Sequence, residues 1–353
     1  MTHILVTGGS GFIGTNFIHH VHKHKPDWHV VNLDALTYAG NPANHRHLEN
    51  DPGYTFVHGS ICDAPLLEQL FDTYQFDGVF HFAAESHVDR SIAGPEVFVN
   101  TNVTGTFRLL DAALAHVRKH PDAEFRFVHV STDEVYGSLG PDDPAFAETH
   151  AYDPSSPYSA SKAASDHFVK AWYRTYGLPV VVTNCSNNYG PFQFPEKLIP
   201  LMILNILDKK PLPVYGKGMN VRDWLYVADH CDALVRAFEN GDNGETYNIG
   251  GGEEKTNLEV VKTICDLMDD KTGNPRGSSR ERITFVTDRP GHDLRYAINP
   301  DKAVEKIGYK ASYTFEQALS ATIDWYLENM DWVKSVQTGA YQEWIQTHYK
   351  TAQ

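Results

Sequence analysis

The stretch Ile4-Leu-Val-Thr-Gly8-Gly-Ser-Gly11-Phe-Ile-Gly14 joins an apolar run to a glycine-rich turn. The run predicts a strand and the residues after the turn predict a helix, a setting in which glycines let the backbone approach a pyrophosphate. Asp34 follows about 20 residues later, at the end of the second predicted strand. An acid there favours the free ribose hydroxyls of NAD and repels the additional phosphate of NADP. We therefore predict a dinucleotide-binding fold and NAD as cofactor.

The N-terminal half of the chain alternates short β-branched runs with longer amphipathic stretches. The predicted strands are residues 3–7, 29–33, 54–58, 78–82, 126–131 and 179–184. The predicted helices are residues 12–24, 64–74, 97–116 and 159–176. Alternation of this kind indicates an α/β fold, a Rossmann-type doubly wound parallel sheet.

The pattern changes after about residue 188, where prolines interrupt the chain often. Residues 238–247 are predicted to return to the sheet, and residues 248–252 to form a turn. We expect an NAD-binding domain made of residues 1–187 and about 222–250. A smaller, discontinuous substrate-binding lobe would comprise about 188–221 and 251–353, with a cleft between the two.

Composition narrows the possible partners and the compartment. The chain has 30 Lys and Arg against 45 Asp and Glu, a formal net charge of −15, which disfavours nucleic acid as a partner. No apolar run approaches the roughly 18 residues of a membrane helix. The four cysteines form no C-x-x-C pair, and the first predicted strand leaves no room for a targeting segment. We expect a cytoplasmic protein that binds no membrane.

A second informative cluster follows the fifth predicted strand. Ser131-Thr-Asp-Glu134 places two adjacent carboxylates at the end of an apolar run, and Tyr158 and Lys162 share one helical face about 25 residues later. The pKa of a phenol is ordinarily about 10. A neighbouring ammonium and a positive nicotinamide ring favour the phenolate, so Tyr158 is predicted to accept a proton while hydride passes to NAD. An acid and a base beside that pair permit removal of water, provided that their pKa values differ.

Eight motifs together resemble the dTDP-glucose 4,6-dehydratases, a family of nucleotide-sugar dehydratases within the extended short-chain dehydrogenases. The similarity runs from residue 4 to about 330 and includes Gly8-Gly-Ser-Gly-Phe-Ile-Gly14, Leu36-Thr-Tyr-Ala-Gly40, Ala83-Ala-Glu-Ser-His-Val-Asp-Arg90, Ser131-Thr-Asp-Glu-Val-Tyr-Gly137, Tyr158-Ser-Ala-Ser-Lys162, Asn187-Asn-Tyr-Gly-Pro191, Arg222-Asp-Trp224 and Arg289-Pro-Gly-His-Asp-Leu-Arg295. The Thr-Asp-Glu triplet is the most discriminating motif, because the similar nucleotide-sugar epimerases lack this acid–base pair.

The resemblance implies an NAD-dependent hydro-lyase that acts on dTDP-glucose. Tyr158, assisted by Thr132 and Lys162, would take the O4 proton during oxidation at C4. Glu134 would then remove the C5 proton, and a protonated Asp133 would donate to the departing C6 hydroxyl. Hydride would finally return to C6.

The resemblance also implies binding residues. Those expected at the cofactor are Gly8, Gly11, Phe12, Ile13, Gly14, Asp34, Ala35, Leu36, Thr37, Ser60, Ile61, Ala83, Ala84, Ser86, Thr101, Tyr158, Lys162 and Asn188. Those expected at the substrate are Ser86, Thr132, Asn187, Lys197, Leu198, Pro213, Tyr215, Arg222, Asn257, Arg289, His292 and Tyr296. Two positions depart from the family pattern, since Ser60 replaces a common aspartate near the adenine and Ala35 a common lysine.

Three further expectations complete the interpretation. His19, His20, His22 and His24 are predicted to form an exposed helical face, and no metal is expected. Apolar residues of the helices 97–116 and 159–176, namely Val103, Leu110, Phe168 and Trp172, suggest that these helices pair across a two-fold axis in a homodimer. Two other functions remain open: a nucleotide-sugar 4-epimerase, and a catalytically silent NAD-binding protein. The nucleotide also remains open between dTDP and UDP, GDP or CDP.

Overall fold

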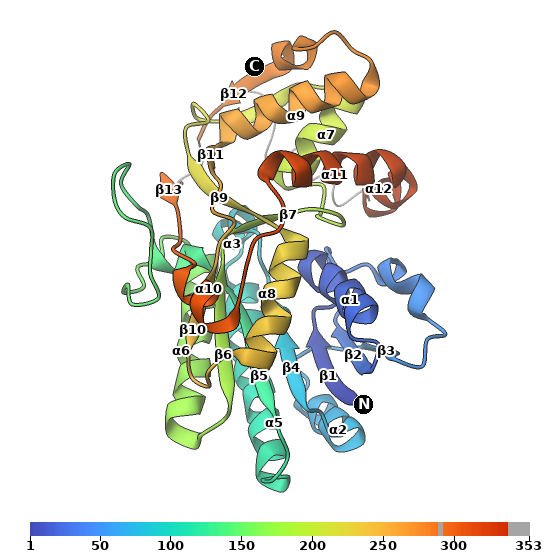
Figure 1. Cartoon of the computed structure of the whole chain (residues 1–353), viewed down its shortest axis with the longest axis vertical. Helices are drawn as coiled ribbons and strands as arrows, with labels where there is room; N and C mark the ends of the chain where they lie inside the picture. The colour runs from blue at the N-terminus through green and yellow to red at the C-terminus, as the bar shows by residue number, and fades with distance from the viewer. Residues whose placement is uncertain (289–291, 338–353) are drawn as a thin grey trace.

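The centre of the molecule is a seven-stranded parallel sheet (Figure 1). The computed structural model describes residues 1–288 and 292–337. The strand order is β10-β6-β5-β4-β1-β2-β3, and every neighbouring pair is parallel. The strands are β1 Thr2–Thr7, β2 Trp28–Asp34, β3 Tyr54–His58, β4 Gly78–His81, β5 Arg126–Thr132, β6 Val180–Cys185 and β10 Thr246–Ile249. The predicted fold class is confirmed.

Helices cover both faces of this sheet. One face packs against α1 (Phe12–His24) and α8 (Val227–Asn240), and the other against α2 (Ala64–Tyr74), α5 (Thr106–Lys119) and α6 (Pro157–Tyr176). Alternate side chains of β1 enter the two cores: Ile4 and Val6 contact the first, and Leu5 the second. Burial on both faces explains why the strands read as continuous apolar runs.

A second group of elements has a hydrophobic core of its own. It includes β7 Asn187–Tyr189, β8 Leu212–Tyr215, β9 Val221–Tyr226, β11 Glu254–Thr256, β12 Ile283–Val286, β13 Arg295–Tyr296, α7 Leu198–Leu207, α9 Asn257–Thr272, η4 Ser278–Arg282, α11 Phe315–Glu328 and α12 Met330–Val336. Figure 1 shows α7, α9 and α11 above the sheet. We propose two lobes on this basis, with two departures from the predicted bounds. β9 belongs to the second group, although residues 222–226 were expected in the NAD-binding domain, and Ala303 and Ile307, expected in the second lobe, pack against β6 and β10. Residues 338–353 lie outside the described part of the chain.

Two predicted elements differ from those observed. The helix expected at 97–116 is divided into α4 (Glu96–Phe98), a π-helical turn η2 (Val99–Gly105) and α5, after the short helix α3 (Val88–Ala93). Residues 238–247 do return to the sheet, but only at their end: α8 continues to Asn240, and β10 begins at Thr246 and occupies part of the expected turn.

The remaining elements are η1 Pro42–Leu48, η3 Asp133–Tyr136 and α10 Asp301–Ile307. Across the described ranges, 1–288 and 292–337, we find no helix with the length and apolarity to cross a bilayer.

The expected exposed histidine face of α1 is wrong in part: His22 and His24 are exposed, but His19 and His20 are partly buried. Burial, together with His45 and His47, lowers the pKa of His19 to about 3. Within the same described residues, no group of three or more His, Cys, Asp or Glu is placed to hold a metal ion.

Candidate active site

The glycine-rich turn forms one wall of a cavity at the carboxyl end of the sheet. Gly8 has a φ of +72°, and a Cβ there would lie 2.7 Å from the backbone of Ala83 at the end of β4. A Cβ on Gly14 would lie 2.4 Å from the Gly8 carbonyl oxygen. These two glycines therefore let the β1–α1 turn pack closely against its neighbours, and they direct the N-terminus of α1 at the cavity.

Asp34 ends β2 and is held in place by backbone groups. One carboxylate oxygen accepts from the Ser10 N–H (2.9 Å) and the other from the Leu36 N–H (2.7 Å). Burial raises the pKa of Asp34, against the effect of these hydrogen bonds. The carboxyl group lines the cavity, where its remaining acceptor capacity suits ribose hydroxyls.

The cavity has a volume of about 380 Å³ and collects nearly all the residues predicted for the cofactor. Of that set, the residues that line it are Gly8, Gly11, Phe12, Ile13, Gly14, Asp34, Ala35, Thr37, Ser60, Ile61, Ala83, Ala84, Ser86, Thr101, Tyr158, Lys162 and Asn188. Leu36 is outside the lining and contributes its backbone N–H to Asp34. A glycine turn, a helix N-terminus and a fixed carboxylate fit a dinucleotide.

The triplet Thr132-Asp133-Glu134 lies where β5 becomes the short helix η3. The Thr132 hydroxyl accepts a hydrogen bond from the Glu134 N–H (3.3 Å) and caps η3, while Asn184 of β6 donates to the Thr132 carbonyl oxygen (3.0 Å). The same hydroxyl donates to Asp133 (3.4 Å) and shares a hydrogen bond with Tyr158. All three residues of the triplet line the cavity, so Thr132 links the acid, the base and the tyrosine.

Asp133 is in an environment that disfavours its charge. Its side chain is 1% exposed, and its Oδ2 has no hydrogen-bond partner among the residues that the structure describes. Burial, followed by the charges of Glu134 and Asp223, raises the pKa of Asp133 well above its usual value, although Arg222 acts in the opposite direction. A buried carboxylate with one long hydrogen bond from Thr132 is costly, so the neutral acid is favoured at neutral pH.

Tyr158 and Lys162 face the cavity from the first turns of α6. The helix begins there because Ser156 and Ser159 form a reciprocal cap and Pro157 occupies the first helical position. The Lys162 ammonium donates to the Val130 carbonyl oxygen (2.9 Å). Burial, Glu134 and Cys185 raise the pKa of Tyr158 well above its usual value. The expected phenolate is therefore not favoured here, because burial and nearby acids oppose the effect of an ammonium.

The predicted substrate residues are divided between two places. Ser86, Thr132, Asn187 and Lys197 line the cavity. Arg222 and Tyr296 are outside the cavity lining, where the Arg222 guanidinium stacks on the Tyr296 ring (4.3 Å). The charge of Arg222 lowers the pKa of Asp133, and the charge of Glu134 raises the pKa of Tyr296.

The other predicted substrate residues are not brought to the cavity wall. Leu198 begins α7, and Pro213, Tyr215, Asn257 and His292 belong to the second group of elements. Arg289 lies outside the described residues.

Sequence reasoning missed a buried acid in the cavity wall. Glu196 is 2% exposed and pairs with Arg90 (3.1 Å) and His87 (3.6 Å). Arg90 in turn stacks on Tyr38, which also lines the cavity (4.0 Å). Arg90 and Tyr38 belong to motifs already quoted. Glu196 directly precedes Lys197, a predicted site residue, and this position could have indicated that Glu196 also belongs to the site.

A family model for GDP-mannose 4,6 dehydratase matches residues 5–322. The chain belongs to the GDP-mannose 4,6 dehydratase family. Within it, dTDP-glucose 4,6-dehydratase 1 of Escherichia coli is 54% identical over 361 residues, which cover 99% of each chain. The resemblance drawn from the sequence motifs is thereby confirmed.

Two solved structures with a similar fold have names that state different reactions, one a dehydratase and the other an epimerase. DesIV, a dTDP-glucose 4,6-dehydratase from Streptomyces venezuelae with NAD and TYD bound, is 45% identical, with a TM-score of 0.87 over 95% of this chain and 100% of that one. A UDP-glucose 4-epimerase from Thermotoga maritima with UDP-glucose is 28% identical, with a TM-score of 0.82 over 93% of this chain and 100% of that one. Because the fold is shared with an epimerase, the site residues must distinguish the two reactions.

Proposed function

We propose that this chain converts dTDP-glucose to dTDP-4-keto-6-deoxyglucose and water with NAD as cofactor. The observation that carries the proposal is the buried, charge-disfavoured Asp133 beside Glu134, in the same cavity as Tyr158 and Lys162. An acid that stays protonated next to a second carboxyl group is what elimination across two bonded carbons requires.

Each residue has a place in the proposed reaction. Tyr158, hydrogen-bonded to Thr132, takes the proton from O4. Bound NAD would supply the hydride acceptor at C4 and later return the hydride to C6. Glu134 removes the proton from C5, which the 4-keto group makes acidic, and Asp133 donates a proton to the C6 hydroxyl as it leaves as water. One water is lost and NAD is unchanged overall.

The competing functions are weaker on specific grounds. A 4-epimerase needs Tyr158 and NAD but has no use for a protonated Asp133. A silent NAD-binding protein would not require Thr132, Tyr158 and Lys162 to meet in one cavity. The names of the relatives favour dTDP over other nucleotides. Pro213 and Tyr215, which we expect to lie near the base, are on β8.

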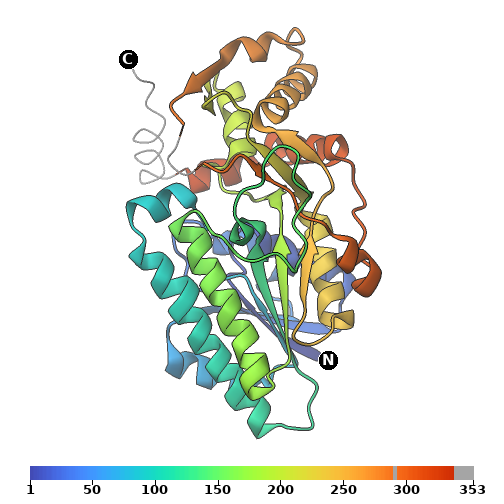
Figure 2. The same cartoon turned by 90° about the vertical axis from the view of Figure 1, so that its left-hand side faces the viewer.

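We also propose an isologous homodimer in the cytoplasm. Figure 2 shows α5 and α6 side by side along one side of the molecule. Exposed apolar side chains on and beside them are Ile92, Val97, Val99, Phe107, Phe168, Tyr173 and Tyr176. The prediction that Leu110 takes part in this contact is wrong, because its side chain is fully buried in the sheet core and is unable to reach another subunit. The four free cysteines suit a reducing compartment.

The function is tested by incubating the purified protein with dTDP-, UDP-, GDP- and CDP-glucose and following loss of one water by mass spectrometry. Deuterium at C4 of the substrate should appear at C6 of the product. Retention of the label at C4 would instead indicate the epimerase.

Because the cofactor is regenerated in each turnover, denatured protein should release NAD in near-stoichiometric amount, whereas a cofactor-free preparation active only with NADPH would refute the cofactor assignment. Sedimentation at micromolar concentration distinguishes a dimer from a 39.6 kDa monomer.

A further inference from the structure

The helix that carries Tyr158 and Lys162 also carries a buried carboxylate that the proposed chemistry does not use. Asp166 follows Lys162 by one helical turn and is 0% exposed. Residues four apart share a helical face, so both side chains point from α6 toward β5. A fully buried ionisable group one turn from a catalytic lysine requires a physical explanation.

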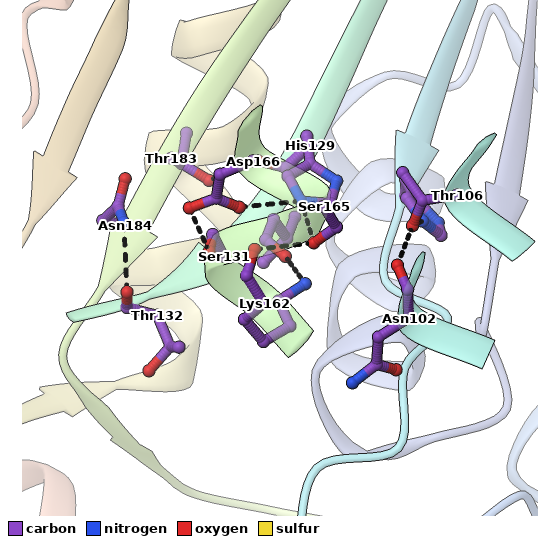
Figure 3. Close-up of polar contacts among 12 residues, drawn as sticks. Asn102, Thr106, His129, Ser131, Thr132, Lys162, Ser165, Asp166, Thr183 and Asn184 are labelled. Carbon is purple, nitrogen blue, oxygen red and sulfur yellow. Dashed lines mark hydrogen bonds and ion pairs between the residues drawn. The ribbon is translucent and has the colours of Figure 1, made fainter. Parts of the chain in front are cut away.

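Three neutral groups donate to the Asp166 carboxylate. His129 Nε2 donates to Oδ1 (3.0 Å), and the hydroxyls of Ser131 and Tyr152 donate to Oδ2 (2.8 and 3.0 Å). Figure 3 shows the carboxylate between Ser131 and His129. Burial by itself would raise the pKa of Asp166, but the hydrogen bonds from His129 and Ser131 and the charge of Lys162 hold it below its usual value. Asp166 is therefore an anion.

His129 does not neutralise this anion. Burial and then the charge of Lys162 lower the pKa of His129 to about 4, although Asp166 acts in the opposite direction. At neutral pH the imidazole is thus an uncharged donor. The remaining titratable groups that act on Asp166 are the tyrosines Tyr136 and Tyr152 and the lysines Lys162 and Lys170. Lys170 is only partly buried, so Lys162 is the cation enclosed with Asp166.

Lys162 needs such a partner. Its side chain is 5% exposed, and burial lowers its pKa while Asp166 raises it. The titratable groups that face it from the packed elements are His81 of β4, His129 of β5, Cys185 of β6 and Asp166 of its own helix. Burial lowers the pKa of His81 well below its usual value and raises that of the Cys185 thiol to about 12. Of these four groups, Asp166 is the charged one.

We propose that Asp166 is a positioning residue whose buried negative charge keeps Lys162 protonated, so that Lys162 promotes loss of the Tyr158 proton. The inference deepens the proposed function and rests on it for the role of Tyr158. Asp166 also connects α6 to the end of β5 through Ser131, the residue before Thr132. It therefore fixes the helix that carries the proton acceptor against the triplet that carries the acid and base.

Removal of the charge has a predictable sign. In Asp166→Asn, burial of Lys162 is no longer opposed, so the lysine loses its proton at lower pH. Tyr158 is then buried beside Glu134 without the cation, and the pH at which it gives up its proton rises. If Lys162 were to remain charged, removal of a nearby anion would shift the profile the opposite way.

The first test is the pH dependence of kcat/KM with dTDP-glucose for the holoenzyme. Asp166→Asn should move the acidic limb of the profile, which reports loss of the Tyr158 proton, about one pH unit or more to higher pH and reduce the rate at least about tenfold at neutral pH. Tyr152→Phe is the matched control, because it removes a donor to the same carboxylate but leaves the charge. A rate loss with an unchanged profile, or a shift to lower pH, would overturn the proposal.

The second test measures thermal unfolding and does not depend on catalysis. Lys162→Met leaves Asp166 as a buried charge without its cation, and Asp166→Asn leaves the lysine. The variant with both changes should unfold at a higher temperature than Lys162→Met. A double variant that is no more stable than Lys162→Met would refute the charge pair, even if the substrate assignment is correct. If the wild-type protein does not act on dTDP-glucose but the double variant is more stable than Lys162→Met, the proposed function is refuted and the charge pair is not.

Discussion

Two buried aspartates, Asp133 directly after β5 and Asp166 on α6 beside it, experience opposite electrostatic environments. Asp133 lines the cavity with one oxygen that lacks a hydrogen-bond partner within residues 1–288 and 292–337, and its pKa is raised by burial and by two neighbouring acids. Asp166 lies behind the strand with three donors and a lysine, and its pKa is lowered. Their exposures, 1% and 0%, are nearly equal. Burial disfavours the charge of both acids; it prevails at Asp133, whereas the donors and the cation around Asp166 overcome it.

The difference also separates two functions of an acid in one site. Asp133 is placed to hold a proton that it gives away, and Asp166 to hold a charge that it keeps. The predictions below test that contrast, beginning with the largest expected effect.

Glu134→Gln should slow dehydration by about 10²- to 10⁴-fold, the usual contribution of a general base. The first hydride transfer should survive, because Tyr158 and Lys162 are unchanged, so reduced nicotinamide should accumulate on the enzyme. Absorbance of the nicotinamide and mass spectrometry of the product measure the two steps. Normal turnover by this variant would show that Asp133 and Glu134 do not act as the acid and base of the reaction.

Asp166→Asn and Asp133→Asn should change the free energy of unfolding in opposite directions at neutral pH. The first leaves Lys162 without its partner and should destabilise by about 3–5 kcal/mol. The second replaces a charge-disfavoured acid by a neutral amide of similar size and should stabilise by about 1–3 kcal/mol, while slowing loss of the C6 hydroxyl. Denaturant unfolding of both variants measures this, and two changes of the same sign would show that the contrast is wrong.

The pH dependence of these differences should also be opposite. The folded-state pKa of Asp166 is lowered, so its contribution to stability is present above the ordinary aspartate pKa of about 4 and is lost as the pH falls below it. The folded-state pKa of Asp133 is raised, so its cost grows as the pH rises above that same value. Unfolding of wild type and the two asparagine variants between acidic and neutral pH measures the slopes.

Tyr152→Phe should destabilise the protein less than Asp166→Asn. It removes one of three donors to Asp166, and a hydrogen bond to a charged group contributes about 1.5–3 kcal/mol. Because a lost donor raises the pKa of Asp166, the destabilisation should diminish at acidic pH, where the carboxylate protonates. A pH-independent loss would show that Tyr152 contributes through packing alone.

Much of the site could be predicted from the sequence, because its signals are local. The glycine turn, the acid at the end of the second strand and the Tyr158–Lys162 spacing each depend on backbone geometry within a few residues or on strand order. The cavity collects these residues as expected. The split helix before α5 and the buried position of Leu110 could not be predicted, since a π-helical turn and the orientation of a helix depend on packing partners.

The sequence by itself determined the fold class, the cofactor turn and the adjacency of Asp133 and Glu134. Only the tertiary structure decided their charges. Asp133 is affected by Asp223 and Arg222 from β9, and Asp166 receives its donors from β5 and from Tyr152 before α6. Desolvation and Coulomb interactions act between groups that are close in space, whatever their separation along the chain. For that reason two aspartates with similar burial became a neutral acid and a permanent anion.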